Sequence, residues 1–538
     1  MDILEKNPKQ KVILLGNEAI ARGALEAGVQ FVSTYPGTPA SEIGNIFYKI
    51  SPQRGNYFEF SVNEKLAMEA AMGSSFSGLK TLVAMKNFGL NVASDAFLPF
   101  IYIGAKGPTV IMVADDPSCH SSAQTEENTR AFAYLANLPV LEPSDPQECL
   151  EFTKLAFKLS SQFKIPVMLR TTTRVSHQKM PVKMGLLSEQ IPPVGKFVKN
   201  HDQFVTMPPR VLEMKKELLE KIEKIRELSE ESGINQVINS KSKAKTGIIT
   251  SGVSYLYVME ALKELGLDLP VLKLGFFHPL PEKKINNFIK KFSKVLVVEE
   301  LEPYLEKEVK RLAKDTNCRL KVSGKDLLPE IGELKPETVL AGVSRFLGKK
   351  YTEKKTNLGI ENFKRSPQIC PGCPYWLVFN GIKKAVEGKE VIFGGDIGCY
   401  MLAGLPPHFL QDYLSHMGSS IGIGHGIRKA TNQKLISFIG DSTFFHAGIP
   451  ALINTVFNKS NPLIMILDNQ TTAMTGHQPN PGMTTLKIDE IARACGVKYV
   501  KVIDPQNQAE FINTVKEYLT KDTVSVIIAK HPCKFAVR

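Results

Sequence analysis

Tryptophan, cysteine and long apolar runs are all scarce in this sequence of 538 residues, which has one Trp and eight Cys. Eight cysteines are too few for a disulfide-stabilised scaffold. No apolar run approaches the roughly 20 residues needed to span a bilayer, and the first eight residues lack the apolar stretch of a signal peptide. We therefore expect a cytoplasmic protein without a membrane partner, whose thiols stay reduced and available for metal binding or catalysis.

A concentrated basic surface is also missing, although 67 Lys and Arg against 54 Asp and Glu give a net charge of +13. The basic residues fall on no recognisable nucleic-acid-binding motif and do not alternate with aromatic residues. We expect no nucleic-acid partner, because an anionic substrate or an acidic partner accounts better for the charge. Hydrophobic residues at 43% and charged residues at 22% are ordinary globular usage, which excludes a disordered or fibrous chain.

The chain is long enough for three to four domains, and its patterns predict three α/β units. In residues 1–200, short β-branched runs at 12–15, 29–33, 81–85, 110–114 and 167–170 alternate with helix-like segments. Such alternation predicts an α/β domain with a mostly parallel sheet. Residues 201–245 read as a charged helical linker, 246–347 as a second α/β unit, 348–364 as a basic linker, and 365–538 as a third unit. The fold class expected is therefore doubly wound α/β.

In the third unit, two predicted strands end in polar residues suited to a metal ion. Asp441 follows Gly440 at the first strand end, and Asn469 follows the next strand 28 residues later. The carboxyl edge of an open α/β sheet is where ligands bind. A carboxylate, an amide oxygen and the Thr471 carbonyl are hard oxygen ligands that suit an octahedral Mg²⁺. Two ordinary strand-end turns, where Asp and Asn are common, would give the same pattern.

The run from Gly440 through Ser442 and Thr443, followed by Asn469, resembles the thiamine-diphosphate motif, with a helix expected from about residue 448. That resemblance implies a cofactor whose aminopyrimidine ring needs a glutamate from a separate pyrimidine domain. Glu64, at a predicted strand end before an Ala-rich helix, matches it, although a carboxylate there could simply complement the helix dipole. His477 lies near the expected cofactor and could equally be structural.

Four cysteines form a second pattern in the third unit. Cys370 and Cys373 open the unit as a C-x₂-C pair, Cys399 follows a glycine, and Cys533 follows a proline near the end. The C-x₂-C pair alone supports zinc, a redox dithiol or an iron–sulfur cluster, and Cys399 and Cys533 could be small buried residues. The four together resemble the 2-oxoacid:ferredoxin oxidoreductases, which implies that these thiolates hold a [4Fe–4S] cluster.

Within that superfamily the chain is most similar to the alpha subunits of indolepyruvate ferredoxin oxidoreductases. The similarity rests on residues 16–24, 35–39, 86–91, 114–118, 141–145 and 471–479. It implies a pyrimidine-binding domain at 1–200, a transketolase C-terminal-like domain at 246–347 and a diphosphate-binding domain at 365–538. It also implies that Thr38 contacts the 2-oxoacid, although Thr38 could equally be only a hydroxyl in a proline-framed turn.

The implied activity is oxidative decarboxylation of an aryl 2-oxoacid to its acyl-CoA with thiamine diphosphate, Mg²⁺ and coenzyme A, electrons passing through the cluster to ferredoxin. The implied assembly holds two copies each of this chain and a beta subunit. Such alpha subunits usually carry a further ferredoxin-like module, whose cysteine runs this sequence lacks. Either a separate subunit carries those clusters, the sequence is part of a longer chain, or electron flow differs. A non-oxidative thiamine-dependent decarboxylase or lyase and a non-catalytic partner-binding chain are the alternatives.

Overall fold

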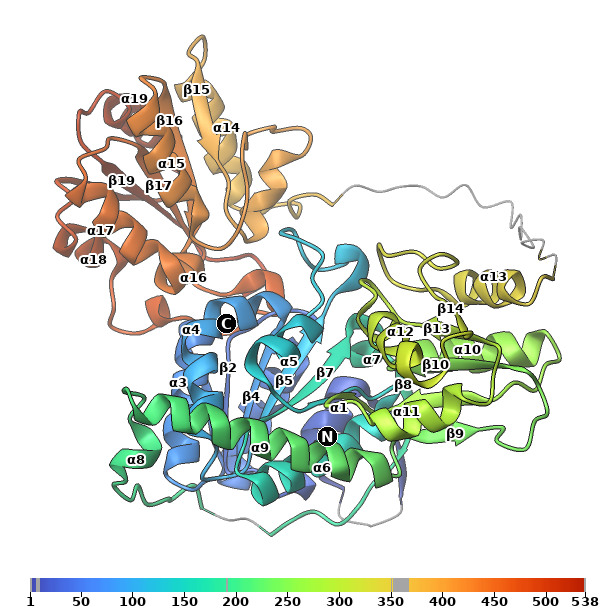
Figure 1. Ribbon diagram of the computed structural model, residues 1–538. Helices are drawn as coiled ribbons and strands as arrows, with labels where there is room; N and C mark the ends of the chain where they lie inside the picture. The colour runs from blue at the N-terminus through green and yellow to red at the C-terminus, as the bar shows by residue number, and fades with distance from the viewer. Residues whose placement is uncertain (1, 6–9, 190–191, 350, 352–366, 537–538) are drawn as a thin grey trace. The chain divides into compact units, whose positions relative to one another are not determined.

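The computed structural model describes residues 2–5, 10–189, 192–349, 351 and 367–536, and it divides the chain into two compact units, 1–356 and 357–538. Figure 1 shows their elements. The basic linker expected at 348–364 lies almost entirely outside the described residues. None of the helices in the described part of the chain is both long and apolar enough to cross a membrane.

The main sheet of residues 1–356 has seven strands in the order β12-β6-β7-β5-β4-β2-β3. All neighbouring strands run parallel except the β12–β6 pair. The central strands are buried along their whole length, as expected of a sheet covered by helices on both faces. The strands are β2 (Phe31–Thr34), β3 (Tyr57–Phe60), β4 (Thr81–Lys86), β5 (Thr109–Asp115), β6 (Val140–Leu141), β7 (Val167–Thr172) and β12 (Phe276–His278).

The run at 12–15 lies outside this sheet. It forms β1 (Lys11–Leu15), which pairs antiparallel with β8 (Lys179–Lys183) in a separate two-stranded ribbon. Exposed and buried residues alternate along part of β1, and Ile13 is 67% exposed. That pattern suits a strand with one face in solvent and not a buried central strand.

A second sheet of five strands has the order β14-β13-β10-β11-β9, with only β9 antiparallel. It is tied to the first sheet because β12, which follows β11 in the chain, pairs with β6. The α/β pattern expected at 246–347 is therefore present, and it shares one compact unit with the preceding residues. Its strands are β9 (Gln236–Ile238), β10 (Thr246–Ser251), β11 (Val271–Leu274), β13 (Lys294–Val298) and β14 (Lys321–Ser323).

Helices follow most strands of this unit. The charged linking helix is α9 (Arg210–Glu231), which buries Leu218, Ile222 and Ile225, three of the residues whose spacing predicts it. The others include α1 (Gly16–Glu26), α2 (Ser41–Arg54), α3 (Glu64–Phe76), α4 (Asn87–Ile103), α5 (Arg130–Ala136), α6 (Pro146–Phe163), α7 (Thr173–His177), α8 (His201–Phe204), α10 (Ser254–Glu264), α11 (Glu282–Ile289), α12 (Tyr304–Thr316) and α13 (Pro336–Phe346).

The unit at 357–538 has one sheet of five parallel strands in the order β15-β16-β17-β19-β18 (Figure 1). Its strands are β15 (Val391–Gly394), β16 (Lys434–Gly440), β17 (Leu463–Asp468), β18 (Tyr499–Ile503) and β19 (Ser525–Lys530). Its α-helices are α14 (Tyr375–Ala385), α15 (Ser419–Ala430), α16 (Asp441–Thr443), α17 (Ile449–Phe457), α18 (Ile488–Ala494) and α19 (Gln508–Tyr518). Both units confirm the α/β fold class.

Candidate functional site

The predicted metal ligands lie at the carboxyl ends of two neighbouring parallel strands. β16 and β17 pair with Gly440 opposite Leu467, so Asp441 and Asn469 leave the sheet at the same edge. Helix α16 begins at Asp441 itself, and a π-helical turn (Phe444–Gly448) leads into α17. The helix expected from about residue 448 is α17, which begins at Ile449 with Gly448 as its N-cap. The turn has room for no side chain at Gly440, where a Cβ atom would lie 2.8 Å from Cε1 of Tyr400.

Asp441 is buried in a polar pocket built by its neighbours. Its Oδ1 accepts from the Ser442 N–H at 2.8 Å, and its Oδ2 accepts from Asn480 Nδ2 at 2.9 Å. Burial, helped by the charge of Asp468, raises the pKa of Asp441 to about 7. A carboxylate held in so poorly solvated a place gains from a bound cation. The donor chemistry therefore fits a divalent metal.

The other two predicted magnesium ligands follow β17 in one loop. Asn469 Oδ1 accepts from the Thr471 N–H at 3.2 Å. Among the described residues, no three His, Cys, Asp or Glu side chains converge as a metal-binding group. A magnesium site here would thus depend on one carboxylate, one amide oxygen and the Thr471 carbonyl, which is the set that the sequence predicts.

The remaining predicted cofactor residues form hydrogen bonds around the same turn. Thr443 Oγ1 donates to the Ile397 carbonyl at 3.0 Å, and Ser442 Oγ accepts from Thr472 Oγ1 at 3.1 Å. His477 has a positive φ of 63° and donates its N–H to the Thr472 carbonyl at 3.0 Å. Its Nδ1 is buried without a hydrogen-bond partner in the described part of the chain, so it is available to a ligand.

The sequence analysis missed Asp396, which organises the adjoining loops. Its side chain is fully buried and accepts hydrogen bonds from the N–H groups of Ile397, Gly418 and Ser420 at 2.8–2.9 Å. Burial raises its pKa to about 6 in spite of these bonds. The carboxylate therefore joins the loop before Cys399 to the start of α15. Its place in a Gly-Gly-Asp-Ile-Gly run is the signal that could have found it.

The loops that carry the predicted cluster cysteines lie near one another, although no three of the thiols converge as a metal-binding group among the described residues. Cys373 donates its N–H to the Cys370 carbonyl at 3.1 Å, and Gly372 between them has a φ of +75°. The segment after β19 lies against this loop, because Lys534 Nζ donates to the Pro371 carbonyl at 3.2 Å. Cys533 in that segment donates its N–H to the Asn469 carbonyl at 3.0 Å. A backbone hydrogen bond thus connects Cys533 to Asn469, a predicted magnesium ligand.

The thiols also raise one another's pKa values. Burial, with contributions from Cys373, Cys533 and Cys370, raises the pKa of Cys399 to about 12. Burial likewise raises the pKa of Cys373 to about 11, with contributions from Cys533 and Cys370. Thiols that disfavour each other's ionisation are suited to a cationic metal or cluster, which neutralises the thiolates.

In residues 1–356, Glu64 is the first residue of α3 and is only 4% exposed. Asn63 caps the helix by accepting from the Leu66 N–H at 2.9 Å. Glu64 lies against the first turn of α4: a Cβ atom added to Gly89 would be 2.7 Å from Glu64 Cγ and 3.0 Å from its Oε1. Gly89 therefore makes room for the carboxylate. Glu69, further along α3, is exposed and faces away.

Thr38 lies in the turn after β2, at the same carboxyl edge of the main sheet. Its Oγ1 is 3.5 Å from Ser41 Oγ, and it precedes a cis proline, Pro39. The carbonyl of Pro39 accepts from Asn17 Nδ2 at 2.7 Å. Asn17, on helix α1, thus holds the turn in place, and the Thr38 side chain remains half-buried. The structure places Thr38 and Glu64 after adjacent strands, β2 and β3.

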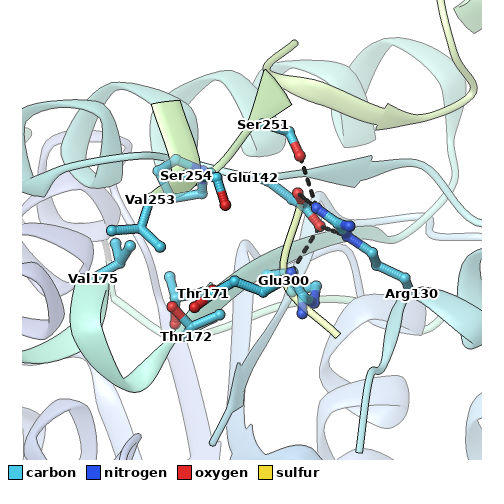
Figure 2. Close-up of a pocket in the computed structure, with 12 residues that line it drawn as sticks. Arg130, Glu142, Thr171, Thr172, Val175, Ser251, Val253, Ser254 and Glu300 are labelled. Carbon is cyan, nitrogen blue, oxygen red and sulfur yellow. Dashed lines mark hydrogen bonds and ion pairs between the residues drawn. The ribbon is translucent and has the colours of Figure 1, made fainter. Parts of the chain in front are cut away.

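A buried ion network joins the two sheets of this unit (Figure 2). Arg130 donates to both oxygens of Glu142 at 2.6–2.7 Å, to Glu299 at 2.7 Å and to Ser251 Oγ at 2.7 Å. Arg170 also donates to Glu142, at 2.9 Å. Although burial opposes it, these two arginines lower the pKa of Glu142 to about 2. The adjoining cavity of about 10 Å³ holds about one water, so the network reads as a structural link.

Three regions of the chain match models of known protein families. Residues 22–209 match the family described as pyruvate flavodoxin/ferredoxin oxidoreductase, thiamine diphosphate-binding. Residues 236–357 match the indolepyruvate oxidoreductase domain, and residues 396–529 match the C-terminal TPP-binding domain of thiamine pyrophosphate enzymes. The second and third regions contain β10 and Asp441, respectively.

Individual relatives cover nearly the whole chain. Indolepyruvate oxidoreductase subunit IorA of Methanothermobacter marburgensis is 45% identical over 551 residues, covering 99% of this chain and 88% of that protein. The IorA subunit of Thermococcus kodakarensis is 43% identical over 565 residues, with 99% and 87% covered. A solved 2-oxoglutarate:ferredoxin oxidoreductase from Magnetococcus marinus shares the fold, with a TM-score of 0.51, 18% identity and 63% and 65% coverage. The chain therefore belongs to the indolepyruvate oxidoreductase IorA family, a family of thiamine-diphosphate-binding oxidoreductase subunits.

Proposed function

We propose that this chain is the catalytic alpha subunit of an enzyme that oxidatively decarboxylates an aryl 2-oxoacid such as indolepyruvate. The 2-oxoacid anion and coenzyme A would give the acyl-CoA, carbon dioxide, one proton and two electrons. The observation that carries the proposal is that, within residues 357–538, Asp441 and Asn469 leave the sheet at one edge, and Cys533 donates its N–H to the Asn469 carbonyl. The relatives are named for indolepyruvate, and the Magnetococcus enzyme was solved with coenzyme A bound.

The chain's own residues fit the cofactor in two separate places. Asp441, Asn469 and the Thr471 carbonyl would hold Mg²⁺ and through it the diphosphate, with Gly440 giving the phosphates close access to the backbone. Glu64 would hydrogen-bond the aminopyrimidine ring, and its burial keeps water from competing for that bond. Thiamine diphosphate, when bound, supplies a nucleophilic carbon for the 2-oxoacid. Thr38 would contact the substrate and His477 the cofactor.

The electron path is proposed from the cysteines. Cys370, Cys373, Cys399 and Cys533 would hold a [4Fe–4S] cluster, which supplies one-electron transfer when bound. Electrons would leave through this cluster to a ferredoxin or a ferredoxin-like subunit. We further propose a cytoplasmic assembly containing two copies each of this chain and a beta subunit.

The decisive experiment is anaerobic production of the chain with its partner subunit, followed by iron and acid-labile sulfide analysis. We expect about four of each per chain, and reduction of a viologen dye that requires indolepyruvate, coenzyme A and thiamine diphosphate together. Cys399→Ser should remove the cluster and dye reduction. Cys495→Ser, at a half-buried cysteine elsewhere in the same unit, is the matched control and should change neither.

Three outcomes would contradict parts of the proposal. Zinc in place of iron, with thiamine diphosphate bound, would refute the proposed electron transfer through an iron–sulfur cluster. Release of an aldehyde from the 2-oxoacid without any electron acceptor would support a non-oxidative decarboxylase. A Glu64→Gln variant that retains full thiamine-dependent turnover would exclude Glu64 from activation of the cofactor.

A further inference from the structure

Lys86 stands where the main sheet of residues 1–356 presents its carboxyl edge. It is the last residue of β4 and the N-cap of α4. Its side chain lies directly against the turn that carries Thr38, because a Cβ atom added to Gly37 would be 2.9 Å from Lys86 Cγ. Glu64 and Asp116 lie close enough to act on its charge. Lys86 therefore belongs to the surroundings of both predicted catalytic residues.

The ammonium group of Lys86 has neutral partners. Its Nζ donates to Ser122 Oγ at 2.9 Å and to the Ser121 carbonyl at 3.2 Å. Within the described part of the chain it forms no ion pair shorter than 4 Å, whereas the exposed Lys65 pairs with Asp95 at 2.6 Å. Burial lowers the pKa of Lys86, against the pull of Asp116 and Glu64. A largely buried cation without a contacting carboxylate is costly, and a bound anion would relieve that cost.

The next residue provides a second, independent observation. Asn87 is 1% exposed, yet neither its Oδ1 nor its Nδ2 has a hydrogen-bond partner among the described residues. Buried side-chain amides are almost always bonded, so an unsatisfied one calls for an explanation such as an absent ligand. Asn87 is also the first residue of α4, where the helix dipole favours negative charge. A cation and an unsatisfied amide thus adjoin at one helix start.

We propose that Lys86 binds the carboxylate of the 2-oxoacid substrate beside the Thr38 hydroxyl, with the Asn87 amide as an additional hydrogen-bonding group. The inference rests on the proposed function, and it assigns Lys86 as a substrate-binding residue. A 2-oxoacid is always an anion at neutral pH, and its carboxylate is the group shared by every member of the class. Because Lys86 would recognise only the carboxylate, other residues must select the side chain of the substrate 2-oxoacid.

The chemistry of the reaction predicts how the loss of Lys86 divides between the kinetic constants. The carboxylate leaves as neutral carbon dioxide, so its ion pair with Lys86 weakens toward the transition state. The pair therefore contributes mainly to ground-state binding. Lys86→Met should raise the KM for the 2-oxoacid by about 10- to 100-fold, with kcat changed by less than about threefold. Lys86→Arg keeps the charge and should restore part of the affinity.

A binding experiment tests the same point without turnover. Indole-3-propionate and its neutral primary amide differ only in the charged group, so their relative affinities report carboxylate recognition. The wild-type assembly should prefer the carboxylate by about 10-fold or more, Lys86→Met should bind both alike, and Lys86→Arg should keep the preference. Lys80→Met is the matched control, since Lys80 lies just before β4 at the other strand end and donates to the Ala27 carbonyl at 2.6 Å. It should behave as wild type.

The outcomes separate this inference from the proposed function. An unchanged KM and an unchanged preference in Lys86→Met would overturn the assignment. The assignment would also be overturned if Lys86→Met raised only the KM for coenzyme A or weakened only the binding of thiamine diphosphate. If wild type shows no thiamine-dependent turnover, the proposed function fails while the ligand preference still tests Lys86. If Lys86→Met fails to fold because Ser121 and Ser122 lose their donor, Lys86→Gln retains a donor and replaces it.

Discussion

Substitution of Gly89 by alanine should reduce turnover through its effect on Glu64. The added Cβ atom would lie 2.7 Å from Glu64 Cγ and 2.9 Å from Met85 Cβ, where ordinary contacts begin at 3.4 Å. Met85 is fully buried on a central strand and has no room to retreat. The glutamate side chain must therefore move by at least about 0.7 Å.

A displacement of this size should be visible in catalysis. A misplacement of about 1 Å can cost about 100-fold in rate, so we expect kcat to fall by about 10- to 100-fold with saturating thiamine diphosphate. The affinity for the diphosphate should stay within about threefold of wild type, because residues 357–538 provide its proposed ligands. Steady-state dye reduction and calorimetric titration of the cofactor measure the two quantities.

The matched control is Gly73→Ala. Gly73 is an exposed helical glycine in α3 with no atom within 4 Å of an added Cβ. Alanine there should leave kcat unchanged and stabilise the fold by about 0.4–1 kcal/mol. Retention of full kcat in Gly89→Ala, or an equal loss in Gly73→Ala, would refute the reasoning that the fit of Glu64 against α4 matters.

Three further predictions concern the buried charges, the metal turn and the thiols. Arg130→Met should lower the free energy of unfolding of residues 1–356 by about 3–5 kcal/mol in urea titrations, because two carboxylates stay buried without it; the more exposed Arg174→Met should cost no more than about 1 kcal/mol. Asp441→Asn should weaken magnesium-dependent cofactor binding by more than the 10- to 100-fold typical of an outer-shell partner, and unchanged calorimetric affinity would remove Asp441 from the metal ligands. In iron-free protein, the raised pKa values of Cys373 and Cys399, about 11 and about 12, should leave only about 0.1% of Cys373 as thiolate at pH 8; alkylation followed by mass spectrometry should therefore accelerate as the pH rises toward those values, and fast reaction at pH 8 would contradict this.

The elements of the fold were largely predictable because each depends on a local pattern. The runs at 81–85 and 110–114 became β4 and β5, and the helical spacing after residue 210 became α9. The run at 12–15 was harder, because a four-residue stretch does not reveal whether one face or both will be buried. Its place in a separate ribbon depends on β8, more than 160 residues away.

Some residues of the candidate site were predictable from local sequence patterns, and others were not. Asp441 and Asn469 could be predicted because each directly follows a recognisable strand, and the parallel pairing of those strands then places them together. Gly89 and Lys86 could not, since their roles depend on Glu64 and Gly37, which are distant in sequence and adjacent only after β2, β3 and β4 assemble.

The pairing of β12 with β6 determines where this protein can be divided for biochemical work. A recombinant fragment that stops at residue 245 would leave β6 as an open sheet edge, able to pair with other chains and aggregate. It would also leave the Arg130 guanidinium without Glu299 and Ser251. A fragment that extends to residue 356 retains all three groups. Truncation experiments on pyrimidine-ring binding should therefore use the longer piece, even though the family match that contains Glu64 ends at residue 209.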